Sequence, residues 1–297
     1  MTITPVRLIL GYDGSPQSTA AIEAGAALFP GALAWITHLW TPPFASEPLR
    51  RRLWTGRRQL NEFVAAVERE GQREAERLAA NGVTLARAAG WEAEAVVRRT
   101  YGGEGLEFGQ LAAELDADLV LLGSRGLGGT KALLGSVSDM VVHYSPRPVL
   151  VVPHPLLSAE TAALAGGPVV VGWDGSPGAR QALTAARSLF PVRELLLTAV
   201  DRATAEPADD VDATGGKVTV IHLDSRHEGS ASAVAETLVG YARTRKAAAL
   251  VVGSRGRSLM REVLLGSVAM ATLHHSHRPV LVVPHEDVPP AGHPVTA

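Results

Sequence analysis

Gly11-Tyr-Asp-Gly-Ser-Pro16 returns 161 residues later as Gly172-Trp-Asp-Gly-Ser-Pro177. An apolar run precedes the glycine in both places, as expected of a buried strand. Serine followed by proline is a common start of an α-helix, with serine as the N-cap and proline in the first turn. The stretch therefore predicts a strand, a turn and a helix, and the chain contains this unit twice.

A second pair of repeats lies further along the chain. Gly123-Ser-Arg-Gly126 recurs as Gly253-Ser-Arg-Gly256, and Arg147-Pro-Val-Leu-Val-Val-Pro-His154 recurs at 278–285. These offsets are 130 and 131, so the second copy is shorter in its middle. The extra part of the first copy, residues 42–90, has apolar residues at helical spacing and predicts a long amphipathic helix.

The repeat divides the chain into a first domain at 1–154, a linker at 155–167, a second domain at 168–286 and a tail at 287–297. Asp201–Gly216 and the linker are rich in small and turn-forming residues, so both are expected to be solvated loops. The strands expected in the first copy are Val6–Gly11, Leu33–Trp40, Ala93–Thr100, Leu119–Gly123 and Val149–Val152. Since helices alternate with them, the fold class is α/β, with two tandem doubly wound, Rossmann-like domains that each have a five-stranded parallel sheet.

Composition excludes several classes of protein. The 297 residues are 46% hydrophobic, enough for two cores, and 28 basic against 30 acidic residues give a net charge of -2. Without a strong overall field, neither nucleic acid nor a membrane surface is an expected partner. The absence of cysteine, of an export signal at the start and of an apolar run of spanning length predicts a cytoplasmic protein.

The glycine-rich segment after the fourth strand is the candidate anion site. Gly126-Leu-Gly-Gly-Thr-Lys131 leads to Gly135-Ser-Val-Ser138, and the second copy keeps Gly266-Ser-Val before Ala269. Glycines let backbone amides approach an anion, and a helix N-terminus attracts one. The alternative is that Ser136 and Ser267 only cap their helices, with Asp139 completing a capping box in the first copy.

An aspartate follows each first strand, at the edge where parallel sheets bind ligands. Asp13 and Asp174 therefore suit hydrogen bonds from ribose hydroxyls or an adenine amine. The alternative for both is a turn aspartate that binds its own backbone. The acidic strand end, the glycine loop and the Gly-Ser helix start occur together, in the same order, in both copies.

With these motifs the chain resembles the universal stress protein family in its tandem two-domain form, a Rossmann-like fold of the adenine nucleotide alpha hydrolase type. Members that bind ATP carry glycine, two residues, glycine, nine residues and then Gly-Ser or Gly-Thr. The second copy meets this spacing from Gly253 to Ser267, whereas the first copy has only eight residues between Gly126 and Gly135.

The resemblance implies a set of ligand contacts in each copy. Adenosine contacts would come from Gly11, Asp13 and Leu39, and from Gly172, Asp174 and Val200. Phosphate and ribose contacts would come from Gly123, Gly126, Gly135, Ser136, Val137 and Ser138, and from Gly253, Gly256, Gly266, Ser267 and Val268. Ala269 lacks the hydroxyl of Ser138.

Other motifs are weaker. The glycine cluster follows the fourth strand rather than the first, which argues against a dinucleotide fingerprint, and Lys131 has the wrong neighbours for a P-loop. His274, His275 and His277 have no carboxylate arranged beside them, so a structural or solvent-facing role is favoured over a metal site. The arginine cluster at 50–58 is interpreted as a solvated helix face.

The leading hypothesis is a nucleotide-dependent sensor or regulator that binds ATP with Mg²⁺ and hydrolyses it slowly at most. No catalytic residue is expected, because no general base is placed near the loop, and no metal-ligating residue is expected, because the histidines have no carboxylate arranged beside them. The alternatives are a nucleotide-free interaction scaffold and an ATP-dependent enzyme. The repeated Pro-Val-Leu-Val-Val-Pro strands predict pairing of the two copies as an intramolecular pseudo-dimer, and a further homodimer is left open.

Overall fold

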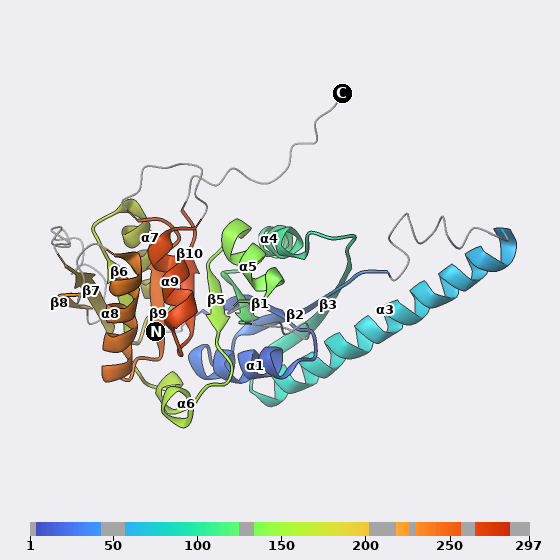
Figure 1. Cartoon of the computed structure of the whole chain (residues 1–297). Coiled ribbons are helices and arrows are strands. Elements are labelled where there is room, and N and C mark those ends of the chain that lie inside the picture. Colours follow the sequence, from blue (N-terminus) through green and yellow to red (C-terminus); the bar gives the residue numbers. More distant parts are fainter. Residues whose placement is uncertain are drawn as a thin grey trace.

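The structure is a computed structural model that describes residues 4–42, 57–124, 134–201, 218–225, 230–256 and 265–285. These residues form two α/β units that lie side by side (Figure 1). The strands are β1 (Arg7–Gly11), β2 (Leu33–Trp40), β3 (Glu92–Arg99), β4 (Leu119–Gly123), β5 (Val149–Val152), β6 (Val169–Trp173), β7 (Leu195–Val200), β8 (Val218–Leu223), β9 (Ala249–Gly253) and β10 (Val280–Val283). The helices are α1 (Pro16–Leu28), α3 (Arg57–Ala88), α4 (Glu104–Glu114), α5 (Ser136–Tyr144), α6 (Ser158–Leu164), α7 (Pro177–Leu189), α8 (Ala231–Thr244) and α9 (Ser267–His275).

The strands form one continuous sheet in the order β3-β2-β1-β4-β5-β10-β9-β6-β7-β8, ten strands among the described residues. Pairing is parallel within each half. This arrangement confirms the predicted doubly wound α/β fold. The two five-stranded sheets are not separate, however, because they join edge to edge.

The repeated motif forms the predicted strand, turn and helix in both copies. Ser15 and Ser176 cap α1 and α7, each accepting a hydrogen bond from an amide three residues on, at 3.1 Å. Pro16 and Pro177 occupy the first helical position. These caps fix where each helix starts, and therefore how the turn after the first strand faces the sheet edge.

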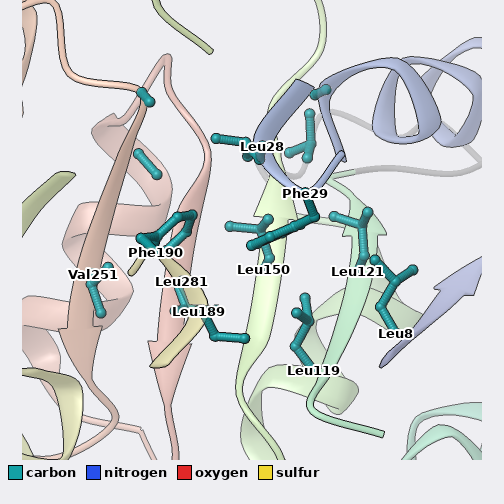
Figure 2. Packing of buried hydrophobic residues seen from close by; sticks show 14 of the residues in the cluster. Leu8, Leu28, Phe29, Leu119, Leu121, Leu150, Leu189, Phe190, Val251 and Leu281 are labelled. Carbon is teal, nitrogen blue, oxygen red and sulfur yellow. The ribbon is translucent and has the colours of Figure 1, made fainter. Parts of the chain in front are cut away.

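The two halves meet at an antiparallel pair, β5 with β10, in which Leu150 lies opposite Leu281. Above this seam the rings of Phe29 and Phe190 stack with centroids 5.3 Å apart (Figure 2). Both phenylalanines come from the repeated Leu-Phe-Pro sequence. The predicted pairing of the two copies within one chain is confirmed.

Two hydrophobic clusters cover the two faces of the sheet, and each runs across the seam. Alternate residues of a strand point to opposite faces, so Leu8 and Leu10 belong to one cluster and Ile9 to the other. The cores of the two copies are therefore continuous. We treat the seam as part of the fold rather than as a contact between independent domains.

The copies differ most in α3, the predicted long helix of the first copy, which extends well beyond the sheet that it covers (Figure 1). Gly71 and Gly82 of α3 lie against Trp40 and Ile36 of β2, where a Cβ would be 3.1 and 2.7 Å from those side chains. The corresponding stretch of the second copy, 202–217, lies outside the described residues. The same holds for the tail at 287–297.

The prediction of a solvated linker is wrong for its middle part, which forms α6. Leu164 is 2% exposed and belongs to the core cluster on the α1 and α7 face. Glu160 is also buried, with Oε1 3.9 Å from Nη2 of Arg278. The alanine-rich composition that suggested a loop is compatible with a short helix once tertiary packing supports it.

Among the described helices, none is both long and apolar enough to cross a bilayer.

Candidate functional site

A cavity of about 490 Å³ opens in the second copy where β6, β7 and β9 end and α9 begins. This is the sheet edge at which doubly wound folds bind ligands. The residues that line it are Gly172, Trp173, Asp174, Ser176, Ala179, Thr198, Val200, Asp201, Ala231, Val234, Leu238, Val252, Gly253, Arg255, Gly256, Gly266, Ser267, Val268 and Ala269.

All eight residues singled out in the second copy lie on this one cavity: Gly172, Asp174, Val200, Gly253, Gly256, Gly266, Ser267 and Val268. They come from three strand ends and a helix start that are up to 96 residues apart in sequence. The structure thus brings the predicted set together.

Asp174 is both a turn aspartate and a wall of the cavity. Its Oδ1 accepts a hydrogen bond from the Ser176 amide at 3.0 Å, which fixes the carboxylate at the end of β6. Oδ2 faces Gly256, where a Cβ would lie only 2.9 Å away. Glycine at 256 therefore leaves space beside the Asp174 carboxylate that a larger residue would fill.

Helix α9 starts without a side-chain cap. Its N-cap is Gly266, with no side-chain hydrogen bond, and Ser267 is already the first helical residue and is exposed. The first backbone bond of the helix runs from the Met270 amide to the Gly266 carbonyl at 3.0 Å. The amides of residues 267–269 precede it, as the free donors of a helix N-terminus do.

The first copy has the same geometry, with Gly135 as the N-cap of α5 and no side-chain cap. The alternative that Ser136 and Ser267 cap their helices is therefore wrong, and so is the capping box with Asp139. The glycines already have extended backbone angles, φ -71° and ψ 152° or 154°, so the cap position falls one residue earlier than serine. The two hydroxyls are left at the exposed surface.

Each glycine loop is tied to the seam. The Gly266 amide donates to the Ser254 carbonyl at 2.6 Å, and the Ser254 amide donates to the Val283 carbonyl of β10 at 2.7 Å. In the first copy the Gly135 amide donates to the Ser124 carbonyl at 2.7 Å, and the Ser124 amide donates to the Val152 carbonyl of β5 at 2.8 Å. The described residues that flank each loop are thus hydrogen-bonded to each other and to β5 or β10, the strands that join the copies.

The lining of the cavity combines apolar and charged residues. Val200, Leu238 and Val252 form an apolar wall of the kind that suits a flat ring. The charged residues of the lining are Asp174, Asp201 at the end of β7 and Arg255 in the segment after β9. The Asp201 carboxylate accepts hydrogen bonds from the amide and hydroxyl of Ser225 at 2.7 and 2.8 Å.

Several lining residues were not predicted from the sequence. They are Trp173, Ala179, Thr198, Asp201, Ala231, Val234, Leu238, Val252 and Arg255. Arg255 lies within the repeated Gly-Ser-Arg-Gly motif, so its repetition was an available signal. Leu238 and Val252 follow an ordinary core pattern, and only the packing of α8 on the sheet shows that they also border the cavity.

The Ser138 hydroxyl has a different partner from the predicted one. It is buried and donates to the Gly123 carbonyl at 2.9 Å, which ties α5 to the end of β4. Ala269 occupies this place in the second copy and is also buried. What Ala269 lacks is a bond between helix and strand, not a hydroxyl directed at a phosphate.

The other predicted residues of the first copy lie at the corresponding sheet edge, except Gly126, which falls in 125–133, outside the described residues. Asp13 repeats the turn of Asp174, with its Oδ1 accepting from the Ser15 amide at 3.0 Å. Gly123 lies against α1, where a Cβ would be 2.8 Å from the Gln17 carbonyl oxygen. Ser136 is exposed at the start of α5 while Leu39 and Val137 pack against the core.

The histidine group and the arginine cluster singled out in the sequence lie away from the cavity lining or outside the described residues. No group of three His, Asp or Glu side chains in that part of the chain is arranged for a metal ion. His275 ends α9, and its Nε2 lies 3.4 Å from the Ser232 hydroxyl. Arginines 50–52 lie outside the described residues.

A duplicated α/β unit, with an aspartate after the first strand and a Gly-Ser helix start in each copy, defines a tandem protein of the doubly wound class. The sequence model of the universal stress protein family matches residues 6–153 and 167–284. The chain therefore belongs to the universal stress protein family, and each copy corresponds to one match.

Relatives agree with this assignment. A universal stress protein of Mycolicibacterium smegmatis is 27% identical over 94% of this chain and 97% of its own length. One of Thermus aquaticus is 33% identical over 49% of this chain and 96% of its own length. The crystal structure of a universal stress protein from Archaeoglobus fulgidus shares the fold, with a TM-score of 0.63, 21% identity and coverage of 94% of this chain and 98% of that one.

Proposed function

We propose that the second copy binds ATP together with Mg²⁺, and that the protein acts as a nucleotide-dependent regulator in the stress response. The observation that carries the proposal is the cavity beside α9, which joins apolar lining residues to an uncapped helix N-terminus. Its volume of about 490 Å³ lies within the range of sites for small ligands.

The lining residues divide into three chemical roles. The apolar wall of Val200, Leu238 and Val252 suits the adenine ring. Asp174 suits the ribose hydroxyls, because a carboxylate fixed by its own turn accepts such bonds without reorganising. The amides at the start of α9, with the Ser267 hydroxyl, suit the phosphates.

Charge supports the same orientation. Arg255 is one of the residues that line the cavity, and we expect a cation at this edge to attract phosphate oxygens. Mg²⁺, when bound, would reduce the charge of the phosphates and would keep most of its ligands as phosphate oxygens and water. Asp174 already accepts from the Ser176 amide of its own turn, and Asp201 from the Ser225 amide after β8, so we expect hydrolysis to be slow.

The bonds between loop and seam provide a route for regulation. Ser254 connects the loop to Val283 of β10, and β10 pairs with β5 of the first copy. A ligand held at Gly266 would therefore stabilise the strand pair that joins the two copies.

Isothermal titration calorimetry of the purified chain with ATP and Mg²⁺ tests the proposal. We expect saturable binding to the wild-type chain. Asp174→Ala should bind ATP about tenfold more weakly, because it loses one charge-assisted hydrogen bond to the ligand. Gly240→Ala is the matched control, because Gly240 has open space around it on α8 and does not line the cavity. Absence of saturation in the wild-type chain at millimolar ATP would refute the proposal.

A further inference from the structure

The first-strand glycine has different surroundings in the two copies. Beside Gly172, a Cβ would be 3.4 Å from Val252 and 3.5 Å from Leu238, which is ordinary van der Waals contact. Beside Gly11, a Cβ would be only 2.5 Å from Leu122 and 3.0 Å from Phe108. The space next to the glycine is thus narrower in the first copy.

The side chains responsible occupy corresponding positions. Phe108 and Leu238 are 130 residues apart, as are Leu122 and Val252, which is the offset of the Gly-Ser-Arg-Gly repeat. The equivalence holds in space, because each pair faces its own first-strand glycine. The first copy therefore has the larger side chain at both positions, phenylalanine in place of leucine and leucine in place of valine.

The third apolar residue of this wall follows the same trend. Val200 lines the cavity of the second copy at the end of β7, and Leu39 takes its place at the end of β2. Leu39 packs against the same core cluster that contains Phe108 and Leu122. All three positions of the apolar wall carry a larger side chain in the first copy.

Packing holds these larger groups in place. Phe108 and Leu122 are each 4% exposed. Side chains in a close-packed core cannot swing aside without displacing their neighbours. Leu238 and Val252 are equally buried, at 2% and 4% exposed, so the larger volume of Phe108 and Leu122 is what narrows the space beside Gly11.

We infer that the chain binds one nucleotide, in the second copy, and that Phe108 and Leu122 close the base end of the first copy. This inference rests on the proposed function of the second copy. The spacing of the glycine motif agrees with it, because the first copy is one residue short between Gly126 and Gly135 while the second copy is complete. The first copy then serves as a fixed partner across the seam, and binding follows a single-site isotherm.

Exchange of the side chains between the copies tests the inference. The opened variant, Phe108→Leu with Leu122→Val, gives the first copy the residues of the second. The closed variant, Leu238→Phe with Val252→Leu, makes the reverse change. Titration with ATP and Mg²⁺ should give a stoichiometry of one for the wild type, two for the opened variant and loss of binding for the closed variant, each variant being checked for an unchanged circular dichroism spectrum.

Photolabelling of the wild-type chain with 8-azido-ATP keeps the test independent of how the variants fold. Competable label is expected in peptides from 168–285 and not in peptides from 4–154. A wild-type stoichiometry of two, label within 4–154, or a folded opened variant that still binds one nucleotide would overturn the inference. Absence of any binding to the wild type would instead refute the proposed function, so the two failures are distinguishable.

Discussion

At the scale of single residues, the candidate site depends on glycines at which two backbone segments pack too closely for a side chain to fit between them. Gly178 in the first turn of α7 lies against the loop after β9, and a Cβ there would collide with the Arg255 carbonyl oxygen. Gly253 faces the same contact from the other side, with a Cβ position 2.7 Å from the Gly178 backbone. The pair sets how closely α7 approaches the strand that leads into the glycine loop.

Gly178→Ala should therefore destabilise the protein, although glycine to alanine in a helix normally stabilises by about 0.5–1 kcal/mol. We expect a loss of about 1–3 kcal/mol in the free energy of unfolding, because the added methyl group meets backbone that cannot move aside. Urea denaturation measures this loss. Gly240→Ala, also within a helix but with no atom near its Cβ position, should show the opposite sign.

The contrast between the two glycines would disappear if α7 tolerated a small shift. Equal stabilisation of both variants would show that the contact between Gly178 and Arg255 is looser than the structure has it. The repeat in the sequence predicted a turn at both Ser-Pro starts. It did not indicate this contact, since glycine packing against distant backbone leaves no local pattern.

At the scale of elements, local signals predicted most of the strands and helices. The Ser-Pro starts of α1 and α7 and the apolar run of β5 are set by neighbours within a few residues, so their bounds agree with the structure. Helix α6 was missed because seven residues form no stable helix alone, and its stability comes from burying Leu164. The alternative that serine caps α5 and α9 put each N-cap one residue late. The presence of serine does not indicate that the preceding glycine, Gly135 or Gly266, already has the extended backbone angles of an N-cap.

The candidate site likewise divides into residues that local sequence predicts and residues that only tertiary packing places there. Asp174 and the Gly266-Ser267 step were found because their motifs are short and repeated. The apolar wall was found only in part, since Leu238 lies on α8 and reaches the cavity through the packing of the helix on the sheet. Long-range packing, rather than sequence spacing, decides which core residues border a ligand site.

Helix α6 is held at its C-terminal end by Arg193, a contact that no sequence pattern indicated. Its guanidinium donates to the carbonyls of Gly167 at 3.0 Å, Leu164 at 2.6 Å and Ala27 at 3.3 Å. Burial lowers the pKa of Arg193 from its ordinary value, but arginine stays protonated at physiological pH. One cation thus links the linker helix to the end of α1 in the first copy.

Arg193→Ala should lower the free energy of unfolding by about 2–3 kcal/mol, because it removes charge-assisted bonds from partly buried carbonyls. Arg98→Ala is the matched control. Its ion pair with Glu114 is exposed, at 45% and 54%, and such pairs contribute about 0–1 kcal/mol. Equal effects of the two variants in chemical denaturation would contradict the role assigned to Arg193.

At the scale of the whole molecule, the seam makes two homologous units into one cooperative structure. The β5 and β10 pair, the shared core clusters and the stacked rings of Phe29 and Phe190 all cross the boundary between copies. Units that share a core should unfold together, unlike domains joined by a flexible linker. The same continuity would let a ligand in one copy stabilise the other.

A double-mutant cycle on Phe29 and Phe190 measures the coupling across the seam. Each single change to alanine should cost about 3–5 kcal/mol, since both rings are nearly fully buried. The double variant should cost less than the sum by about 0.5–1.5 kcal/mol, the additional energy of an aromatic pair. Differential scanning calorimetry should show a single transition for the wild type, with calorimetric and van't Hoff enthalpies in agreement. Additive effects of the two changes, together with two separate transitions, would mean that the copies unfold independently and that the seam transmits nothing between them.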